Sequence, residues 1–282
     1  MKQLPEDTKL ISTYSEIRAH LYDFVEMSRT DNPVQLWVVG PPGTSKSTIV
    51  KESLRGIKHY FVSGSATSAK LYEELYYHRD EIIVFDDLES VYRDRALMSM
   101  LKNLSDTDPI KVVYRIKMRK PDDPIPDSFE TRSPVLIITN GIEIKRTTAL
   151  CHRFEILHFV PNPVEVLNEA DRWFDDKEIL DFVEALLPSL TKLDLRKLNA
   201  IKRNKRKGIR NWRVEAGSIL GLPRNMVIMI DILAGGGYGS RMEQKKEFGR
   251  RTAPEKLDKT VISSWDNCWD RLPLGFKRMY EP

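Results

Sequence analysis

Nine consecutive residues in the first quarter of the chain are of the types that bind the phosphates of a nucleotide. They are Gly40, Pro41, Pro42, Gly43, Thr44, Ser45, Lys46, Ser47 and Thr48. Such a loop holds a triphosphate with converging backbone N–H groups, a lysine that neutralises charge and a hydroxyl that holds Mg²⁺. Lys46 and Ser47 are expected to supply the last two. The loop is therefore predicted to bind a nucleoside triphosphate with Mg²⁺.

The elements on either side of this loop are those that a phosphate site requires. An apolar run over 34–39 predicts a strand, and Ser47 to Leu54 predicts a helix whose amino end faces the phosphates. Glycine usually stands just before the lysine, and this chain has Ser45 there. Serine keeps most of the room if its dihedral angles suit a side chain. A plain Gly/Pro turn is the alternative, and the order of strand, loop, lysine and helix argues against it.

Polar residues also follow two later apolar runs. Asp86 and Asp87 end the run that begins at Ile82. We expect Asp86 to hold Mg²⁺, directly or through water, and Asp87 to orient or deprotonate the attacking water. A strand end followed by an acidic helix cap would look the same. Asn140 ends the run that begins at Leu136, and its amide is predicted to position the water, with a turn residue as the alternative.

The order of these motifs resembles that of the AAA+ class of ATPases. The loop, the Asp-Asp strand and the Thr-Asn strand are followed by Ala149-Leu-Cys-His-Arg-Phe-Glu-Ile-Leu-His-Phe159. In that class a stretch like Leu150 to Phe154 carries an arginine that reaches the ATP of the neighbouring subunit. The resemblance implies Arg153 for that role, with Arg146 as its competitor. It also implies ATP and Mg²⁺ as cofactors and a homo-oligomer, in a ring or filament.

Within that class the chain resembles the superfamily 3 viral replicative helicases over residues 34–165. The shared features are Gly-Pro-Pro at the loop start, paired aspartates, a helix like Leu97 to Leu104 followed by Asp-x-Asp-Pro, and a basic hairpin before the Thr-Asn strand. In those helicases the hairpin contacts single-stranded DNA in a central pore. The resemblance therefore implies DNA contacts by Lys117, Arg119 and Lys120.

Apolar runs at the spacing of strands predict the fold of the first part of the chain. Besides the loop strand they lie at 59–62, 81–85, 134–139 and 155–160, and such runs suit a parallel sheet covered on both faces. We predict an α/β fold with a P-loop AAA+ core over 34–165. A lead-in over 1–33, with a helix near 15–27, precedes it.

The rest of the chain, 166–282, is predicted to be a mainly helical, basic domain. Its run 202–213 carries seven basic and no acidic residues. Phosphate neutralisation dominates nucleic-acid affinity, so this run predicts contacts by Lys202, Arg203, Lys205, Arg206 and Lys207, with a solvated helix face as an equal alternative. Asn211 to Asn225 also fits a helix-turn-helix weakly. Trp265 and Trp269 are expected to pack on one helix face rather than to stack on bases.

The composition excludes several other classes of protein. Apolar residues make up 41% and charged residues 30%, as in soluble globular proteins. No apolar run reaches membrane-spanning length and the amino end lacks the core of a signal peptide, so we expect a cytoplasmic protein with no membrane partner. Two cysteines exclude a disulfide framework and a four-cysteine zinc site.

These features together predict an ATPase that couples hydrolysis to nucleic acid, with single-stranded DNA favoured. A helicase-like replication motor of a virus, phage or mobile element is the leading interpretation, placed in the host cell if viral. One alternative is an ATP-switched DNA-binding adaptor, such as a helicase loader or a transposition regulator. Another is a protein-remodelling ATPase without nucleic acid. Strand displacement on a forked duplex separates motor from adaptor, and stimulation of ATP turnover by nucleic acid separates both from a remodeller.

Overall fold

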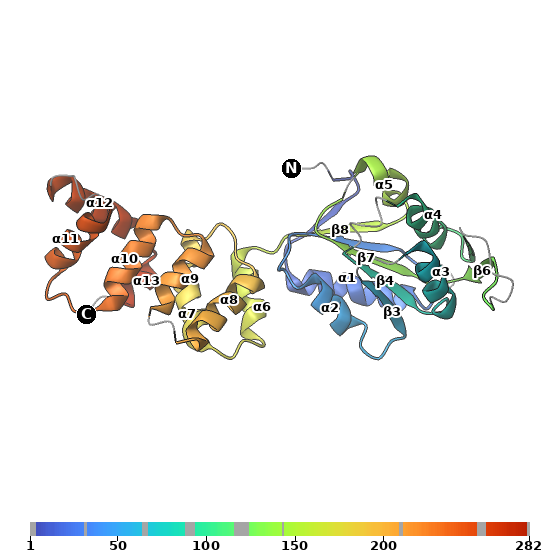
Figure 1. Cartoon of the computed structure of the whole chain (residues 1–282), viewed down its shortest axis with the longest axis horizontal. Helices are drawn as coiled ribbons and strands as arrows, with labels where there is room; N and C mark the ends of the chain where they lie inside the picture. The colour runs from blue at the N-terminus through green and yellow to red at the C-terminus, as the bar shows by residue number, and fades with distance from the viewer. Residues whose placement is uncertain are drawn as a thin grey trace. The chain divides into compact units, whose positions relative to one another are not determined.

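The computed structural model describes most of the chain in several stretches. The described residues are 4–30, 33–63, 67–87, 94–115, 124–142, 144–208, 211–252 and 258–280. The chain divides into two compact units, Met1–Pro161 and Asn162–Pro282 (Figure 1).

A parallel sheet forms the centre of the first unit (Figure 1). Its strand order is β1-β8-β2-β7-β4-β3, and every neighbouring pair runs parallel. The central strands are buried along nearly their whole length, as a sheet covered on both faces requires. The five predicted strands are confirmed. The sheet contains Lys9–Ile11 (β1), Leu36–Val39 (β2), His59–Ser63 (β3), Ile82–Asp86 (β4), Val135–Thr139 (β7) and Glu155–Phe159 (β8).

Strand β1 is an edge strand that the sequence did not predict. It has three residues and pairs with β8, with Ile11 opposite Phe159. Helix α1 (Tyr14–Met27) follows it, begun by a capping box of Thr13 and Glu16, and the ring edge of Tyr14 meets Phe159 at 5.1 Å. The residues before the loop strand are thus part of the first unit.

Helices cover both faces of the sheet (Figure 1). On one face lie α1 and α2 (Lys46–Ser53), and on the other lie α3 (Ser68–Tyr77), α4 (Arg95–Leu104) and α5 (Ile144–Cys151). Apolar side chains of the second group join Trp37 and Phe85 of the sheet in one buried cluster. This burial is the main force that holds the carboxyl ends of the strands in place.

The predicted hairpin is present as a small antiparallel sheet. Strand β5 (Lys111–Tyr114) pairs with β6 (Ser128–Thr131), with Lys111 opposite Thr131. Between them lies 116–123, which is outside the described residues together with the three basic residues predicted there, Lys117, Arg119 and Lys120.

A buried lysine anchors the base of this hairpin. Lys111 is 2% exposed, and its Nζ donates a hydrogen bond of 2.6 Å to the carbonyl oxygen of Ser133. Burial lowers the pKa of Lys111 to about 8, with the charge of Asp106 acting in the opposite direction.

The second unit is helical throughout its described elements. Successive helices pack on one another, among them α8 on α9, α9 on α10 and α11 on α12. Trp265 and Trp269 stack with ring centroids 6.4 Å apart, which confirms that they share a helix face. The helices are Pro163–Asp171 (α6), Lys177–Leu186 (α7), Leu195–Arg206 (α8), Trp212–Leu220 (α9), Arg224–Gly235 (α10), Arg241–Thr252 (α11), Asp258–Arg271 (α12) and Leu274–Arg278 (α13), with a 3₁₀ turn at Leu187–Ser189.

The strand order identifies the fold class. Strand β7 lies between β2, which leads into the phosphate loop, and β4, which ends in the paired acids. The first unit is therefore an α/β domain with the parallel sheet of a P-loop fold, and a mainly helical unit follows it, as predicted.

Candidate phosphate-binding site

The phosphate loop leaves β2 at a position with no room for a side chain. A Cβ on Gly40 would lie 2.1 Å from the carbonyl oxygen of Phe159, closer than any real contact. The Gly40 N–H donates to the carbonyl oxygen of Thr139 on the neighbouring strand, at 3.2 Å. Gly43 has a positive φ of 81°, which glycine adopts without strain. The glycines of the motif are thus needed for the path of the backbone.

Ser45 stands where such loops usually have glycine, and its backbone shows why. Its φ is 59° and its ψ is 22°, the left-handed conformation that costs most L-residues about 1–2 kcal/mol. The sequence analysis made the fit of serine conditional on dihedral angles that suit a side chain, and the angles found are left-handed. Ser45 precedes α2 without giving it a side-chain cap, which leaves the first N–H groups of that helix for a ligand.

Lys46 and Ser47 point toward the ends of the neighbouring strands. The Nζ of Lys46, a residue 6% exposed, donates to the carbonyl oxygens of Gly40 and Pro41, each at 2.8 Å. The Ser47 hydroxyl donates to Oδ1 of Asp86 at 2.9 Å. The loop and the acidic strand end are therefore in direct contact.

Asn140 joins the lysine to the second acid. Its Oδ1 accepts a hydrogen bond of 3.3 Å from Nζ of Lys46, and its Nδ2 donates one of 3.3 Å to Oδ1 of Asp87. Asp87 is exposed, has a positive φ of 65°, and donates its N–H to the carbonyl oxygen of Ile138 at 3.1 Å. The structure thus brings Lys46, Ser47, Asp86, Asp87 and Asn140 together at the carboxyl edge of the sheet.

Backbone strain is concentrated at this edge. Ser45 and Asp87 are the non-glycine residues with positive φ among the described residues. Strained residues of this kind collect at functional sites, where the surrounding structure holds them. Their position supports the loop and the paired acids as one site.

Thr139 is a supporting residue whose role the sequence did not reveal. Its hydroxyl accepts a buried hydrogen bond of 2.9 Å from the indole N–H of Trp37. The bond ties β7 to β2 directly beneath Asn140 and Gly40. A threonine before the asparagine was the visible signal, but its partner lies about a hundred residues earlier, too far for a local pattern to show.

Arg153 does not reach this site within the same chain. It precedes β8, whose first residue pairs with Leu36 at the start of β2, while the loop leaves the other end of β2. Its Nη1 donates to the carbonyl oxygen of Lys102, in the last turn of α4, at 2.7 Å. Arg153 therefore caps a helix at the opposite edge of the sheet. The side chain of Arg146 lies outside the described structure.

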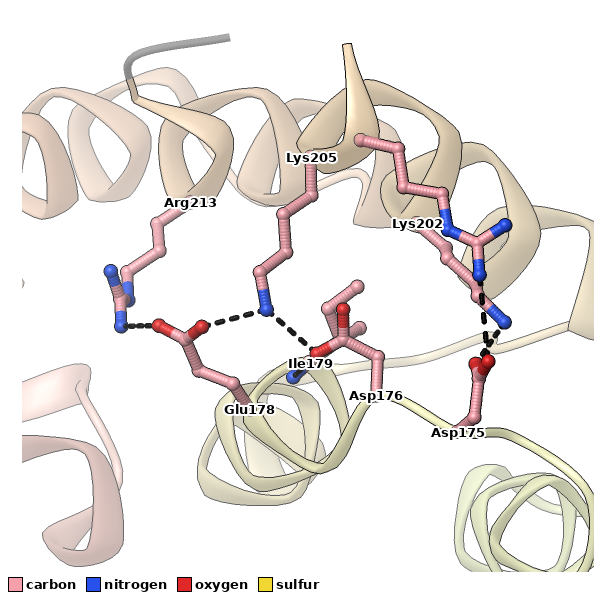
Figure 2. A network of polar contacts seen from close by, with 8 residues as sticks. Asp175, Asp176, Glu178, Ile179, Lys202, Lys205 and Arg213 are labelled. Atoms are coloured by element: carbon pink, nitrogen blue, oxygen red, sulfur yellow. Dashed lines mark hydrogen bonds and ion pairs between the residues drawn. The ribbon is translucent and has the colours of Figure 1, made fainter. Parts of the chain in front are cut away.

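Acidic residues around the start of α7 engage much of the basic run (Figure 2). Lys202 and Arg206 pair with Asp175, and Lys205 pairs with Asp176 at 2.7 Å and with Glu178 at 2.6 Å. The pairing with Lys202 is the main cause that lowers the pKa of Asp175. Arg203 and Lys207 are exposed and have no ion pair in the described structure. The predicted nucleic-acid residues thus differ in how freely their charge is available.

The other features that could contact nucleic acid are more limited. Helices α9 and α10 are joined by a three-residue turn at Gly221, whose φ is 83°, as in a helix-turn-helix. A DNA-reading helix needs an exposed face, but Met229 and Ile232 of α10 are buried and its exposed residues lie at its ends. Trp265 is fully buried, and Arg241 covers the ring of Trp269 at 4.2 Å.

Searches of known proteins give structural neighbours only. No protein-family model matches the sequence, and no curated protein matches it. Two solved structures of RuvB variants from Thermotoga maritima are similar, each at 13% sequence identity. The first has a TM-score of 0.49, and the match covers 93% of this chain and 88% of the RuvB chain. The second has a TM-score of 0.47, and the match covers 91% of this chain and 86% of the RuvB chain. At these values the fold assignment rests on the strand order described above. Among the described residues, no helix is long and apolar enough to cross a membrane.

Proposed function

We propose that this chain binds ATP with Mg²⁺ and hydrolyses it at the carboxyl edge of the first unit's sheet. The observation that carries the proposal is the convergence of Lys46, Ser47, Asp86, Asp87 and Asn140, from three strand ends, on one loop. A phosphate loop, a carboxylate for the metal and a second carboxylate for the water are the parts that phosphoryl transfer to water requires. Lys46 neutralises phosphate charge, Asp87 prepares the attacking water and Asn140 positions it.

The donor atoms fit Mg²⁺. The Ser47 hydroxyl and the Asp86 carboxylate are hard oxygen ligands, already 2.9 Å apart, and Mg²⁺ is bound through one or two such groups together with water and phosphate oxygens. When bound, the metal supplies charge stabilisation to the transferred phosphoryl group. Ser47 lies in the first turn of α2, whose amino end favours anions, and Asp86 ends β4.

Lys46 must change partners when a nucleotide binds. Its Nζ is held by two carbonyl oxygens of its own loop, and a phosphate oxygen is a stronger partner because both members of the bond are charged. Asn140, which touches both Lys46 and Asp87, then links the position of the lysine to that of the second acid.

A ring or filament of several copies of the chain is the assembly that gives Arg153 a role in hydrolysis. Arg153 lies at the edge of the sheet opposite the phosphate loop of its own chain. Any ATP site that Arg153 completes therefore belongs to a neighbouring subunit. Its helix-capping bond occupies Nη1 and leaves other N–H groups of the guanidinium to donate.

The partner of the assembly is nucleic acid, with single-stranded DNA favoured, bound by the exposed basic residues of α8. From the sequence resemblance to superfamily 3 helicases we further propose a helicase-like replication motor of a virus, phage or mobile element, acting in the cytoplasm, or in the host cell if viral.

Replacement of the loop lysine tests the proposal. Lys46→Ala is expected to abolish ATP turnover and weaken nucleotide binding while the thermal melt stays close to that of the wild type. Lys51→Ala is the matched control, because Lys51 is on the same helix with its Nζ over the ring of Phe61, 5.1 Å from the centroid. Phosphate release and binding of a fluorescent ATP analogue are the measurements. Unchanged turnover in Lys46→Ala would refute the site.

A further inference from the structure

We propose that the acidic residues around the start of α7 compete with nucleic-acid phosphates for the basic residues of α8. This inference rests on the nucleic-acid partner of the proposed function. It adds a built-in limit on affinity: part of the positive charge is neutralised within the chain and becomes available only when phosphate displaces a carboxylate.

The contacts divide the basic residues into two groups. Lys202, Lys205 and Arg206 are paired with Asp175, Asp176 or Glu178 (Figure 2). Lys202 also lies over the ring of Phe174 and Lys205 over that of Trp212, which holds their ammonium groups near the acids. Arg203 and Lys207 are exposed without such a partner among the described residues. Their charge can therefore contact phosphate before any ion pair within the chain is broken.

Asp175 and Glu178 are the acids whose ion pairs phosphate can most readily replace. The side chain of Asp175 is 64% exposed and that of Glu178 is 48% exposed. Both carboxylates are therefore already in contact with water and can lose their lysine or arginine partner at little cost. An exposed ion pair shifts an equilibrium by about fivefold at most. A nucleic acid that offers several phosphates in a row can therefore displace them, since phosphate and carboxylate are alternative partners for the same cations.

Asp176 has a different duty. Its Oδ1 accepts a hydrogen bond from the N–H of Ile179 at 3.3 Å and so caps α7, while it also accepts from Lys205. Asp175 lies before this cap, outside the helix. Asp175 is thus the acid whose charge can be removed with the least effect on the fold.

The test compares two neutralisations of equal charge. Asp175→Asn frees Lys202 and Arg206, and it is expected to lower the Kd for a labelled mixed-sequence single-stranded oligodeoxynucleotide by about twofold to fivefold. Asp181→Asn is the control, because Asp181 lies on α7, close to Asp175 in the sequence, but pairs with Lys177. It is expected to change the Kd by less than about twofold, since only long-range charge is altered. Fluorescence anisotropy at two salt concentrations is the measurement, and the log–log salt slope of Asp175→Asn should steepen by up to about 0.7 per added phosphate contact.

A double-mutant comparison shows whether the freed lysine is responsible. Lys202→Gln is expected to weaken binding by less than about twofold in the wild-type background, but to remove much of the gain in the Asp175→Asn background. Equal effects of Lys202→Gln in both backgrounds would overturn the proposal. Glu178→Gln tests the same competition at Arg213 and Lys205, which both pair with Glu178, while Lys205 keeps its pair with Asp176. The outcome therefore does not depend on the fold of a single variant.

The outcomes separate this inference from the proposed function. If the wild type binds the oligonucleotide and neither Asp175→Asn nor Glu178→Gln binds more tightly, competition is refuted and the function stands. If no variant binds, the nucleic-acid partner is wrong and the competition falls with it.

Discussion

Asp87 combines an exposed carboxylate with a left-handed backbone, and a useful substitution must respect both. Asparagine tolerates that conformation better than most residues. Asp87→Asn should therefore keep the fold and the binding of Mg-ATP, yet lower turnover by about 10²-fold or more if Asp87 is the base. Asp80→Asn, an exposed acid before the other end of β4, is the control. Normal turnover in Asp87→Asn would move the catalytic role elsewhere, and the next acid along the chain, Glu89, which lies outside the described residues, would be the next candidate.

Ser45 tests whether the loop depends on its dihedral angles. Ser45→Gly should bind nucleotide as well as the wild type, because the relief of about 1 kcal/mol of strain offsets the larger entropy of glycine in the unfolded chain. Ser45→Val places a β-branched residue at a φ of 59° and should raise the Kd for nucleotide by about tenfold or more. Ser53→Val, at the far end of α2, should leave the Kd unchanged. Equal binding by Ser45→Val and the wild type would contradict the role of the backbone.

Residue types and spacing predicted which side chains meet at this site, but not how the backbone presents them. Asp86, Asp87 and Asn140 lie at strand ends, Lys46 and Ser47 follow the loop that leaves β2, and parallel strands bring their carboxyl ends to one edge. The left-handed residue Asp87 is bonded through its N–H to Ile138 on another strand, which no local pattern encodes. The sequence likewise did not predict the helix-capping hydrogen bond from Arg153 to the carbonyl oxygen of Lys102.

At the scale of elements, the hairpin base makes a prediction about pH. Burial lowers the pKa of Lys111 to about 8, whereas the unfolded chain keeps it near 10.5. Below pH 8 the folded protein bears the full cost of a buried charge. Between pH 8 and 10.5 the unfolded state binds more protons, so stability rises with pH. Relative to Lys111→Met, the unfolding free energy of the wild type should rise by up to about 3 kcal/mol across that range.

Urea unfolding of both proteins at several pH values is the measurement, since comparison with Lys111→Met cancels the other groups that titrate there. Lys102→Met, at a half-buried lysine in the last turn of α4, is the control substitution. Parallel pH profiles of wild type and Lys111→Met would contradict a lysine that is neutralised on folding.

Apolar runs of four or more residues were predictable, whereas the three-residue edge strand and the ion pairs between distant elements were not. The buried strands appear as apolar runs because both faces of the sheet are covered. Strand β1 has only three residues, Lys9–Ile11, too few to show a period. The pairing of Lys202 with Asp175 joins elements that the sequence could not place side by side, so the basic run looked free of acids.

At the scale of the molecule, the proposed oligomer makes a prediction that one chain cannot satisfy. The loop and Arg153 lie at opposite edges of the sheet, so a site that uses both needs two copies. Preparations of Lys46→Ala alone or Arg153→Ala alone should be inactive. In a mixture, an Arg153→Ala subunit supplies an intact loop and a Lys46→Ala neighbour supplies an intact arginine, so some ATP turnover should return. Because Arg153 also caps α4, its variant should lose about 1–2 kcal/mol of stability, and its thermal melt must show a folded protein.

The matched control mixes Lys46→Ala with Asp86→Ala, two changes on the same side of the interface. Every site in that mixture has a defective loop or metal ligand in its own subunit, and no arrangement of neighbours repairs it. Phosphate release is measured against mixing ratio, with mixed assembly verified by co-purification of differently tagged chains. Recovery only in the Arg153→Ala mixture supports a trans arginine, with a maximum at intermediate ratios where unlike neighbours are most frequent. If mixed oligomers form and turnover stays at the sum of the separate preparations, Arg153 is a helix cap alone, and hydrolysis is completed within one chain.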